Sequence, residues 1–184
     1  MKHKLEVDYN AARGFLADRE VNDAFAKSIK ALEVLEGREG RGNEFLGWLD
    51  LPSETDETLL SRIEGVARRW QNGIDVVVII GIGGSYLGSK AALDALTHHF
   101  DLYLEKSSSP KIVFAGQNLS EDYLSELMEL LSAKSAAAVV ISKSGTTTEP
   151  AVAFRIIKQH FEEKYGKEES ARRIVAVTDE SRGA

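Results

Sequence analysis

The sequence predicts a three-layer α/β fold, in which a mostly parallel sheet lies between helices and follows an N-terminal helical segment. Two observations predict it. Four short apolar runs between residues 76 and 178 are separated by segments whose apolar residues have helical spacing, and this alternation is typical of βαβ units. The first 75 residues show helical spacing without such runs. For the sheet we consider the strand order 2-1-3-4, in which strands 1 and 3 are neighbours.

The N-terminal segment is expected to contain two main helices. Apolar residues at helical spacing run from Val21 to Leu35 and stop at the glycine-rich loop Gly37–Gly42. Residues 43–52 are apolar but have no clean period. Residues 53–56 are typical of a helix N-cap followed by acidic residues, and a second apolar face then runs over residues 59–70.

The remaining elements follow from residue type and spacing. The continuous β-branched run Val76–Ile80 predicts a strand that is buried on both faces. Three further strands are expected at Lys111–Ala115, Ala137–Ile141 and Arg173–Thr178. The helices between them are expected at about Ser85–Phe100, after an N-cap at Ser120, and from about Thr148 to Lys164, with Pro150 in a first turn that tolerates proline. We therefore divide the chain into a helical segment, residues 1–74, expected to pack on the core, and an α/β domain, residues 75–184.

Composition excludes several classes of protein. The 184 residues include no cysteine, which excludes disulfide scaffolds, thiolate metal sites and a cysteine nucleophile, and only four histidines, which argues against a histidine-rich metal site. The net charge of −6 comes without a basic run, so a general nucleic-acid binder is disfavoured. No apolar run approaches a bilayer span, and the N-terminus has no signal-peptide core. We expect a cytoplasmic protein with neither nucleic-acid nor membrane partners.

Two strand-to-helix loops are unusually rich in glycine and hydroxyl groups. Gly81–Gly88 follows the first strand, and Ser142–Pro150 follows the third. In the order 2-1-3-4 these loops lie side by side at the switch point where ligands bind in open parallel sheets. Backbone N–H groups, hydroxyls and helix N-termini suit a phosphate monoester. The alternative is that the hydroxyls are ordinary helix caps and the glycines ordinary turn residues.

Nucleotide motifs are not matched. Tyr86 stands where the dinucleotide fingerprint needs a small residue, and the pair Ser89-Lys90 has the wrong order for a Walker A motif. A sugar phosphate is therefore the better candidate ligand. Lys143 is the only cation in the two stretches Gly81–Gly88 and Ser142–Pro150. Glu149 is their only carboxylate, and its plainer interpretation is a favourable charge at a helix N-terminus or a partner for an arginine.

The stretches VVVIIGIGGSYLGSKAAL and VVISKSGTTTEPAVAFRIIK resemble bacterial glucose-6-phosphate isomerases. The N-terminal segment Gly42–Pro52 and the last 24 residues are also similar to that family, so the resemblance covers essentially the whole chain. Either loop alone would indicate only a sugar isomerase (SIS) domain. The resemblance implies a flavodoxin-like sheet of order 2-1-3-4 whose outer strand is missing from this chain.

The resemblance implies interconversion of glucose 6-phosphate and fructose 6-phosphate, in glycolysis and gluconeogenesis, without a metal or organic cofactor. After ring opening, a proton moves between C2 and C1 through an enediol. By match to the motifs, hydroxyl side chains bind the phosphate, glycine backbone lines the sugar site, Lys143 lies beside the substrate, and Glu149 supports the site rather than acting as the base. The candidate phosphate- and substrate-binding residues are Gly83, Gly84, Ser85, Ser142, Lys143, Ser144, Gly145, Thr146 and Thr147.

The family resemblance also implies what this chain lacks. Members are much longer, carry a second SIS domain and form homodimers. Their general base, their ring-opening histidine, a lysine late in their sequence and a catalytic arginine would all lie beyond Ala184. We therefore expect an N-terminal portion of an isomerase that is inactive alone. The alternative is a stand-alone SIS module that binds a phosphosugar and regulates a partner, although a sensor would not need the Gly42–Pro52 segment.

Overall fold

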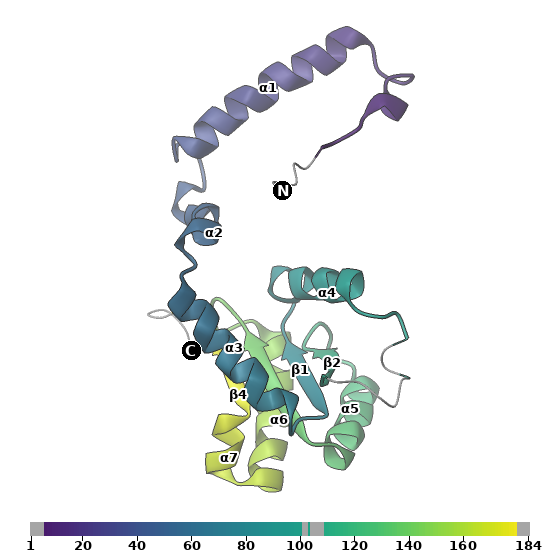
Figure 1. Cartoon of the computed structure of the whole chain (residues 1–184), viewed down its shortest axis with the longest axis vertical. Coiled ribbons are helices and arrows are strands. Elements are labelled where there is room, and N and C mark those ends of the chain that lie inside the picture. Colours follow the sequence, from purple (N-terminus) through teal and green to yellow (C-terminus); the bar gives the residue numbers. More distant parts are fainter. Residues whose placement is uncertain (1–5, 101–102, 104–108, 180–184) are drawn as a thin grey trace. The chain divides into compact units, whose positions relative to one another are not determined.

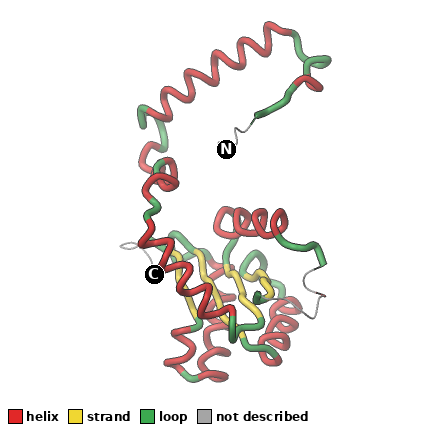
Figure 2. Tube along the Cα trace, in the orientation of Figure 1, coloured by secondary structure: helices red, strands yellow, loops and turns green. Residues whose placement is uncertain are grey.

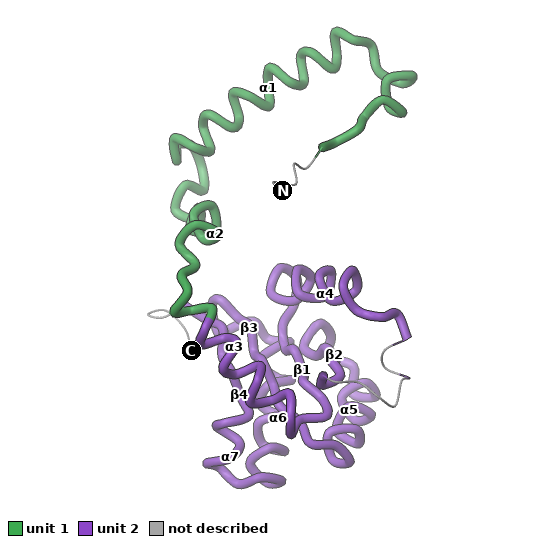
Figure 3. The backbone as a smooth tube through the Cα atoms, viewed as in Figure 1, with its two compact units in different colours: residues 1–60 green, residues 61–184 purple. Residues whose placement is uncertain are grey.

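The computed structural model describes residues 6–100, 103 and 109–179. The chain divides into two compact units, residues 1–60 and 61–184 (Figure 3). No helix in these described ranges is both long and apolar enough to cross a lipid bilayer.

The first unit is helical. Helix α1, Asp18–Glu36, spans the predicted apolar stripe, and the stretch without a clean period forms the 3-10 segment η2, Asn43–Leu49, and the short helix α2, Leu51–Glu54. A further 3-10 turn, η1, covers Asn10–Ala12. Helix α3, Glu57–Gln71, begins in this unit and continues into the second. The predicted cap is corrected in one respect: Ser53 lies inside α2, and Asp56 accepts the hydrogen bond from the Leu59 amide at 2.7 Å.

The second unit is built on a parallel sheet of four strands (Figure 2). These are β1, Val76–Ile80, β2, Lys111–Ala115, β3, Ala136–Ile141, and β4, Ile174–Val177. The sheet has the order β2-β1-β3-β4, with parallel pairing throughout. The expected α/β class and strand order are therefore confirmed.

Helices connect the strands as the apolar spacing indicates. Helix α4, Gly84–Leu96, ends four residues before the expected Phe100, because the backbone adopts an extended conformation at Thr97. Helices α5, Glu121–Ala133, and α6, Thr148–Tyr165, begin after Ser120 and Thr147. The helix α7, Lys167–Arg172, is an addition that the sequence reasoning did not foresee; Gly166, with φ of 77°, separates it from α6.

The core has one cluster on each face of the sheet. On one face, alternate residues of β1 and β3 pack against α5 and α6, whose side chains Leu131, Ile157 and Phe161 are fully buried. On the other face, Val77 and Ala137 pack with Trp70 of α3 and Ile74. The connection from β1 to β2 runs one way along the sheet, and the connections from β2 to β3 and from β3 to β4 run the other way. Because such crossovers are right-handed, α4 covers the face of the sheet opposite to α5 and α6 (Figure 1).

Candidate functional site

The two glycine- and hydroxyl-rich loops leave adjacent strands at the same level of the sheet. Ile80, the last residue of β1, is paired with Val140 of β3. Gly81 begins the first loop, and a Cβ placed on it would lie 3.3 Å from the carbonyl oxygen of Ile141. Sheet topology therefore brings together two segments that are about sixty residues apart in the sequence, as expected for a switch point.

The first loop turns directly into helix α4. Gly83 occupies the N-cap position with φ of 55° and ψ of −128°, a conformation that favours glycine. Gly84 and Ser85 form the start of the helix, and the Ser85 amide donates to the carbonyl of Ile82 at 3.1 Å. Gly83 and Gly84 are exposed and Ser85 is half-buried, so backbone and hydroxyl lie at an accessible helix N-terminus.

The second loop is organised by its own hydroxyl groups. The Ser142 hydroxyl accepts a hydrogen bond from the Gly145 amide at 3.0 Å. The Ser144 hydroxyl accepts from both the amide, at 3.2 Å, and the hydroxyl, at 3.0 Å, of Thr146. Gly145 has a φ of 69°, which lets the chain reverse between these residues. Four predicted site residues thus shape the loop that we expect to surround an anion.

The remaining candidates of this stretch are Lys143 within the loop, and Thr147 and Glu149 at the start of α6. Thr147 is its N-cap residue and is exposed, as is Lys143. Glu149 lies half-buried in the first turn, beside the buried Pro150. A carboxylate in that turn is favourably placed in the field of the helix dipole, which is the plainer interpretation of Glu149.

The three strand-to-helix loops differ in how their helices are capped. Helix α5 has a side-chain cap, because the Ser120 hydroxyl accepts from the Tyr123 amide at 3.3 Å. Within the described part of the chain, the N-cap residues Gly83 of α4 and Thr147 of α6 provide no such side-chain bond. The two helix N-termini at the candidate site are therefore the ones without a side-chain cap, and an external anion suits them.

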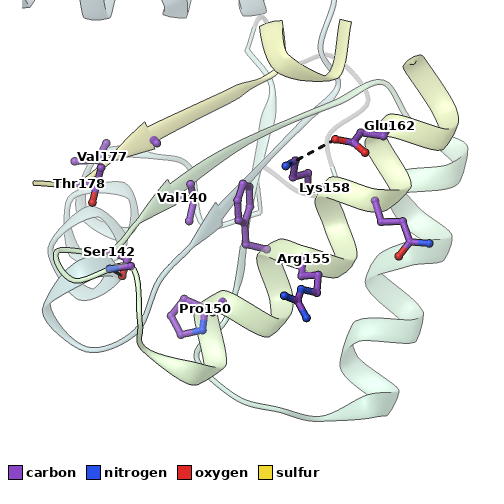
Figure 4. Close-up of a pocket in the computed structure, with 13 residues that line it drawn as sticks. Val140, Ser142, Pro150, Arg155, Lys158, Glu162, Val177 and Thr178 are labelled. Carbon is purple, nitrogen blue, oxygen red and sulfur yellow. Dashed lines mark hydrogen bonds and ion pairs between the residues drawn. The ribbon is translucent and has the colours of Figure 1, made fainter. Parts of the chain in front are cut away.

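Two of the cavities among the described residues lie against the sheet, and neither of these two encloses both loops. A cavity of about 620 Å³ lies between α6 and strands β3 and β4 (Figure 4). Of the predicted site residues only Ser142 and Gly145 line it, and its rim carries the Lys158–Glu162 ion pair, 3.8 Å between Nζ and Oε1. A cavity of about 1140 Å³ on the opposite face is lined by residues of α3, α4 and β2. The candidate site is instead an open edge formed by the two loops.

The loop after β2 is not among the segments that the sequence predicts for the site. Gly116 in that loop is buried and has a φ of 79°, and it lies against the start of α6. The only local signal was a glycine directly after a strand. Its neighbour Gln117 has a buried side-chain carbonyl with no hydrogen-bond partner among the described residues.

Comparison with known proteins gives one consistent family. A family model described as phosphoglucose isomerase matches residues 62–183. The chain is 46% identical over 182 residues to a glucose-6-phosphate isomerase of Alkaliphilus metalliredigens, covering 98% of this chain and 40% of that relative. It is 44% identical over 189 residues to a glucose-6-phosphate isomerase of Bacillus thuringiensis, covering 100% of this chain and 41% of that relative.

Solved structures agree with these relatives. A crystal structure of a hypothetical protein from Thermus thermophilus is similar with a TM-score of 0.68 and 26% identity, covering 88% of this chain and 37% of that one. The crystal structure of a glucose-6-phosphate isomerase from Chlamydia trachomatis is similar with a TM-score of 0.52 and 29% identity, covering 67% and 23%. The chain spans about two fifths of the length of the curated relatives it matches.

Proposed function

Because the chain belongs to the phosphoglucose isomerase family, we propose that its two loops bind the phosphate group shared by glucose 6-phosphate and fructose 6-phosphate. The whole protein would interconvert these two sugars. In this proposal the chain supplies the residues that bind the phosphate, and proton transfer needs residues outside this chain.

The observation that carries the proposal is the backbone at Gly84. This residue lies in the first turn of α4 without a positive φ. Apart from its chain neighbours and the nearby backbone of its own helix, a Cβ placed on it would meet no described heavy atom within 4 Å. Glycine in a helix costs about 0.5–1 kcal/mol relative to alanine. Neither the fold nor local packing explains the glycine, whereas close approach of a ligand to the helix N-terminus does.

Hydroxyl groups complete the anion site in this proposal. Ser85 contributes from the first loop, and Ser142, Ser144 and Thr147 contribute from the second. The uncapped N-termini of α4 and α6 both favour a negative charge, and Lys143 adds a positive charge beside the sugar. The glycine backbone at residues 83 and 84 would face the sugar, and Gly145 and Thr146 would hold the second loop in the shape that presents its hydroxyls.

Proton transfer between C2 and C1 requires a base within hydrogen-bond reach of the substrate carbon. Glu149 is the only carboxylate in the two loops, and we assign it a supporting position at the helix start. We therefore propose that the general base belongs to a second SIS domain, in keeping with the 40% of the relatives' length that this chain spans. The 184-residue chain alone would bind substrate weakly without turning it over, and the whole protein would act as a cytoplasmic homodimer.

Two assays on the purified chain test this function. Fructose 6-phosphate should raise the unfolding temperature, since a ligand that binds the folded state stabilises it by mass action. NAD and ATP should leave the unfolding temperature unchanged, and protection by either would point to a nucleotide site instead. Isomerase activity above that of a vector control would refute the assignment of the base to another domain.

The alternative function is a stand-alone phosphosugar sensor, which would use the same anion site. Binding assays on the isolated chain do not separate it from the isomerase. Joining the chain to the non-matching remainder of the Alkaliphilus metalliredigens relative does, because the isomerase proposal expects the joined protein to gain activity. A joined protein that folds and binds fructose 6-phosphate but stays inactive would favour the sensor.

A further inference from the structure

The loop after β2 meets the start of α6 at a contact between two backbones. A Cβ placed on Gly116 would lie 2.9 Å from the Cα of Pro150. It would also lie 3.2 Å from the Cγ2 of Ile80 and 3.4 Å from the amide nitrogen of Gly81. Gly116 therefore contacts the first turn of α6 and the end of β1, where the first loop begins, at the same time.

The atoms around Gly116 have little freedom to move away. Pro150 is buried in the first turn of α6, and its Cα belongs to the backbone. Ile80 is fully buried in the sheet. The Gly81 amide is held by a hydrogen bond to the carbonyl of Ala115 at 3.0 Å, directly before Gly116. An added methyl group would therefore displace backbone rather than the end of a flexible side chain.

We propose that Gly116 is a positioning residue, whose missing side chain sets the spacing between the N-terminus of α6 and the loop that leads into α4. The proposal rests on the proposed function for the identity of the ligand, but the spacing itself is a property of the protein alone. Gly116 does not need to touch the ligand. It acts through Pro150 and Gly81, which lie at the roots of the two candidate loops.

Spacing matters because an anion held between two helix N-termini depends on both at once. Hydrogen bonds weaken steeply as donor and acceptor depart from their preferred distance and angle. With a Cβ on residue 116, the contact of 2.9 Å would have to widen to ordinary van der Waals separation, 3.4 Å or more. That shift would move the start of α6, and with it the N-cap residue Thr147 and the preceding loop that contains Ser144, relative to the first loop.

Helix α6 provides a matched control at its other end. Gly166 has a φ of 77°, almost the same as the 79° of Gly116, and a Cβ there would meet no heavy atom of the described chain within 4 Å. Alanine at either position places a side chain on backbone with a positive φ, which L residues rarely adopt. Only alanine at 116 also collides with backbone. The pair of variants therefore separates backbone strain from displacement of the site.

The experiment compares Gly116→Ala and Gly166→Ala in the full 184-residue chain. It measures the affinity for fructose 6-phosphate and, without ligand, the amide chemical shifts of residues 81–85, 142–149 and 151. Both variants should lose stability. Gly116→Ala should also shift those amides and weaken binding by about tenfold or more, since small misplacements of a positioned group have large effects. Gly166→Ala should leave the amides and the affinity unchanged.

A second pair of variants keeps the test informative if an alanine variant fails to fold. Asparagine retains a Cβ but adds a polar group that can hydrogen-bond to nearby backbone, so Gly116→Asn and Gly166→Asn repeat the comparison with a second side chain. If the variants at 116 show wild-type amide shifts and affinity, the inference is overturned. If wild-type protein fails to bind fructose 6-phosphate, the proposed function fails, while the amide shifts still decide the role of Gly116.

Discussion

Ile80 and Val140 face each other across the neighbouring strands β1 and β3, so the loops that follow them begin at the same edge of the sheet. This pairing brings the two short motifs, far apart in the sequence, to one edge of the sheet, where we propose that they form one site. The hydroxyl groups come mainly from the second loop and the open glycine backbone from the first. A negatively charged ligand suits this proposed site, because helix N-termini and amides would surround it.

Replacing Gly84 by alanine should separate function from stability. The helical backbone and open surroundings of Gly84 accept a methyl group, so Gly84→Ala should raise the free energy of unfolding by about 0.5–1 kcal/mol. The methyl group would lie where we place the ligand, so affinity for fructose 6-phosphate should fall. Urea unfolding and calorimetric titration check the two effects. A variant that loses stability and keeps its affinity would show that Gly84 serves the fold.

The Ser120 cap should contribute to stability without contributing to binding. Its hydroxyl accepts from the Tyr123 amide at the start of α5. Ser120→Ala should lower the free energy of unfolding by about 1 kcal/mol, as for other N-cap serines. The control is Ser132→Ala, because that hydroxyl donates to the Met128 carbonyl inside an exposed helical turn and leaves no N-terminal amide unpaired. Equal unfolding energies for the two variants would contradict the capping role.

The face of the sheet covered by α5 and α6 should dominate the stability of the second unit. Phe161 is fully buried there, whereas Ile156 on the same helix is 38% exposed. Phe161→Ala should lower the free energy of unfolding by about 3–5 kcal/mol through lost burial and a cavity. Ile156→Ala should cost much less. Chemical unfolding of both variants provides the measurement, and similar losses would mean that this core is assigned to the wrong residues.

Strand β4 lies at an edge of the sheet in the described chain, and its exposed backbone should promote self-association. Val177 is 50% exposed on this strand. Val177→Lys should reduce concentration-dependent association in sedimentation velocity, because a charged edge strand resists pairing. Leu119→Lys, at a similarly exposed residue outside the strands, is the control. If both substitutions reduce association equally, general surface hydrophobicity rather than the edge is responsible.

The strands were predictable because each is a compact apolar run; β1 and β2 have the expected bounds. Ends of helices were less predictable. Phe100 continues the apolar spacing of α4, yet the helix stops at Leu96, and the Thr97 hydroxyl donates to the Leu93 carbonyl at 2.7 Å. Helix α7 was missed because its charged residues carry no apolar stripe.

The candidate loops could be found from residue types, since glycine, serine and threonine after strands have a direct chemical meaning. Gly116 could not be found in this way. Its importance comes from contact with Pro150, which is distant in the sequence and reaches it only because β2 and β3 flank the same strand. Contacts of this kind depend on the packed sheet and not on local spacing.

The central claim is that an anionic headgroup is bound by the hydroxyls and amides of the two loops. Calorimetric titration of the chain with fructose 6-phosphate, before and after replacing Ser144 and Thr147 by alanine, tests it most directly. The paired control replaces Thr97 and Ser132, whose hydroxyls donate to carbonyls within their own helices. Hydrogen bonds to charged groups contribute about 1.5–3 kcal/mol each, so the variant that lacks both hydroxyls should lose affinity by about a hundredfold or more, and the control none. Unchanged affinity in the Ser144 and Thr147 variant would contradict the account.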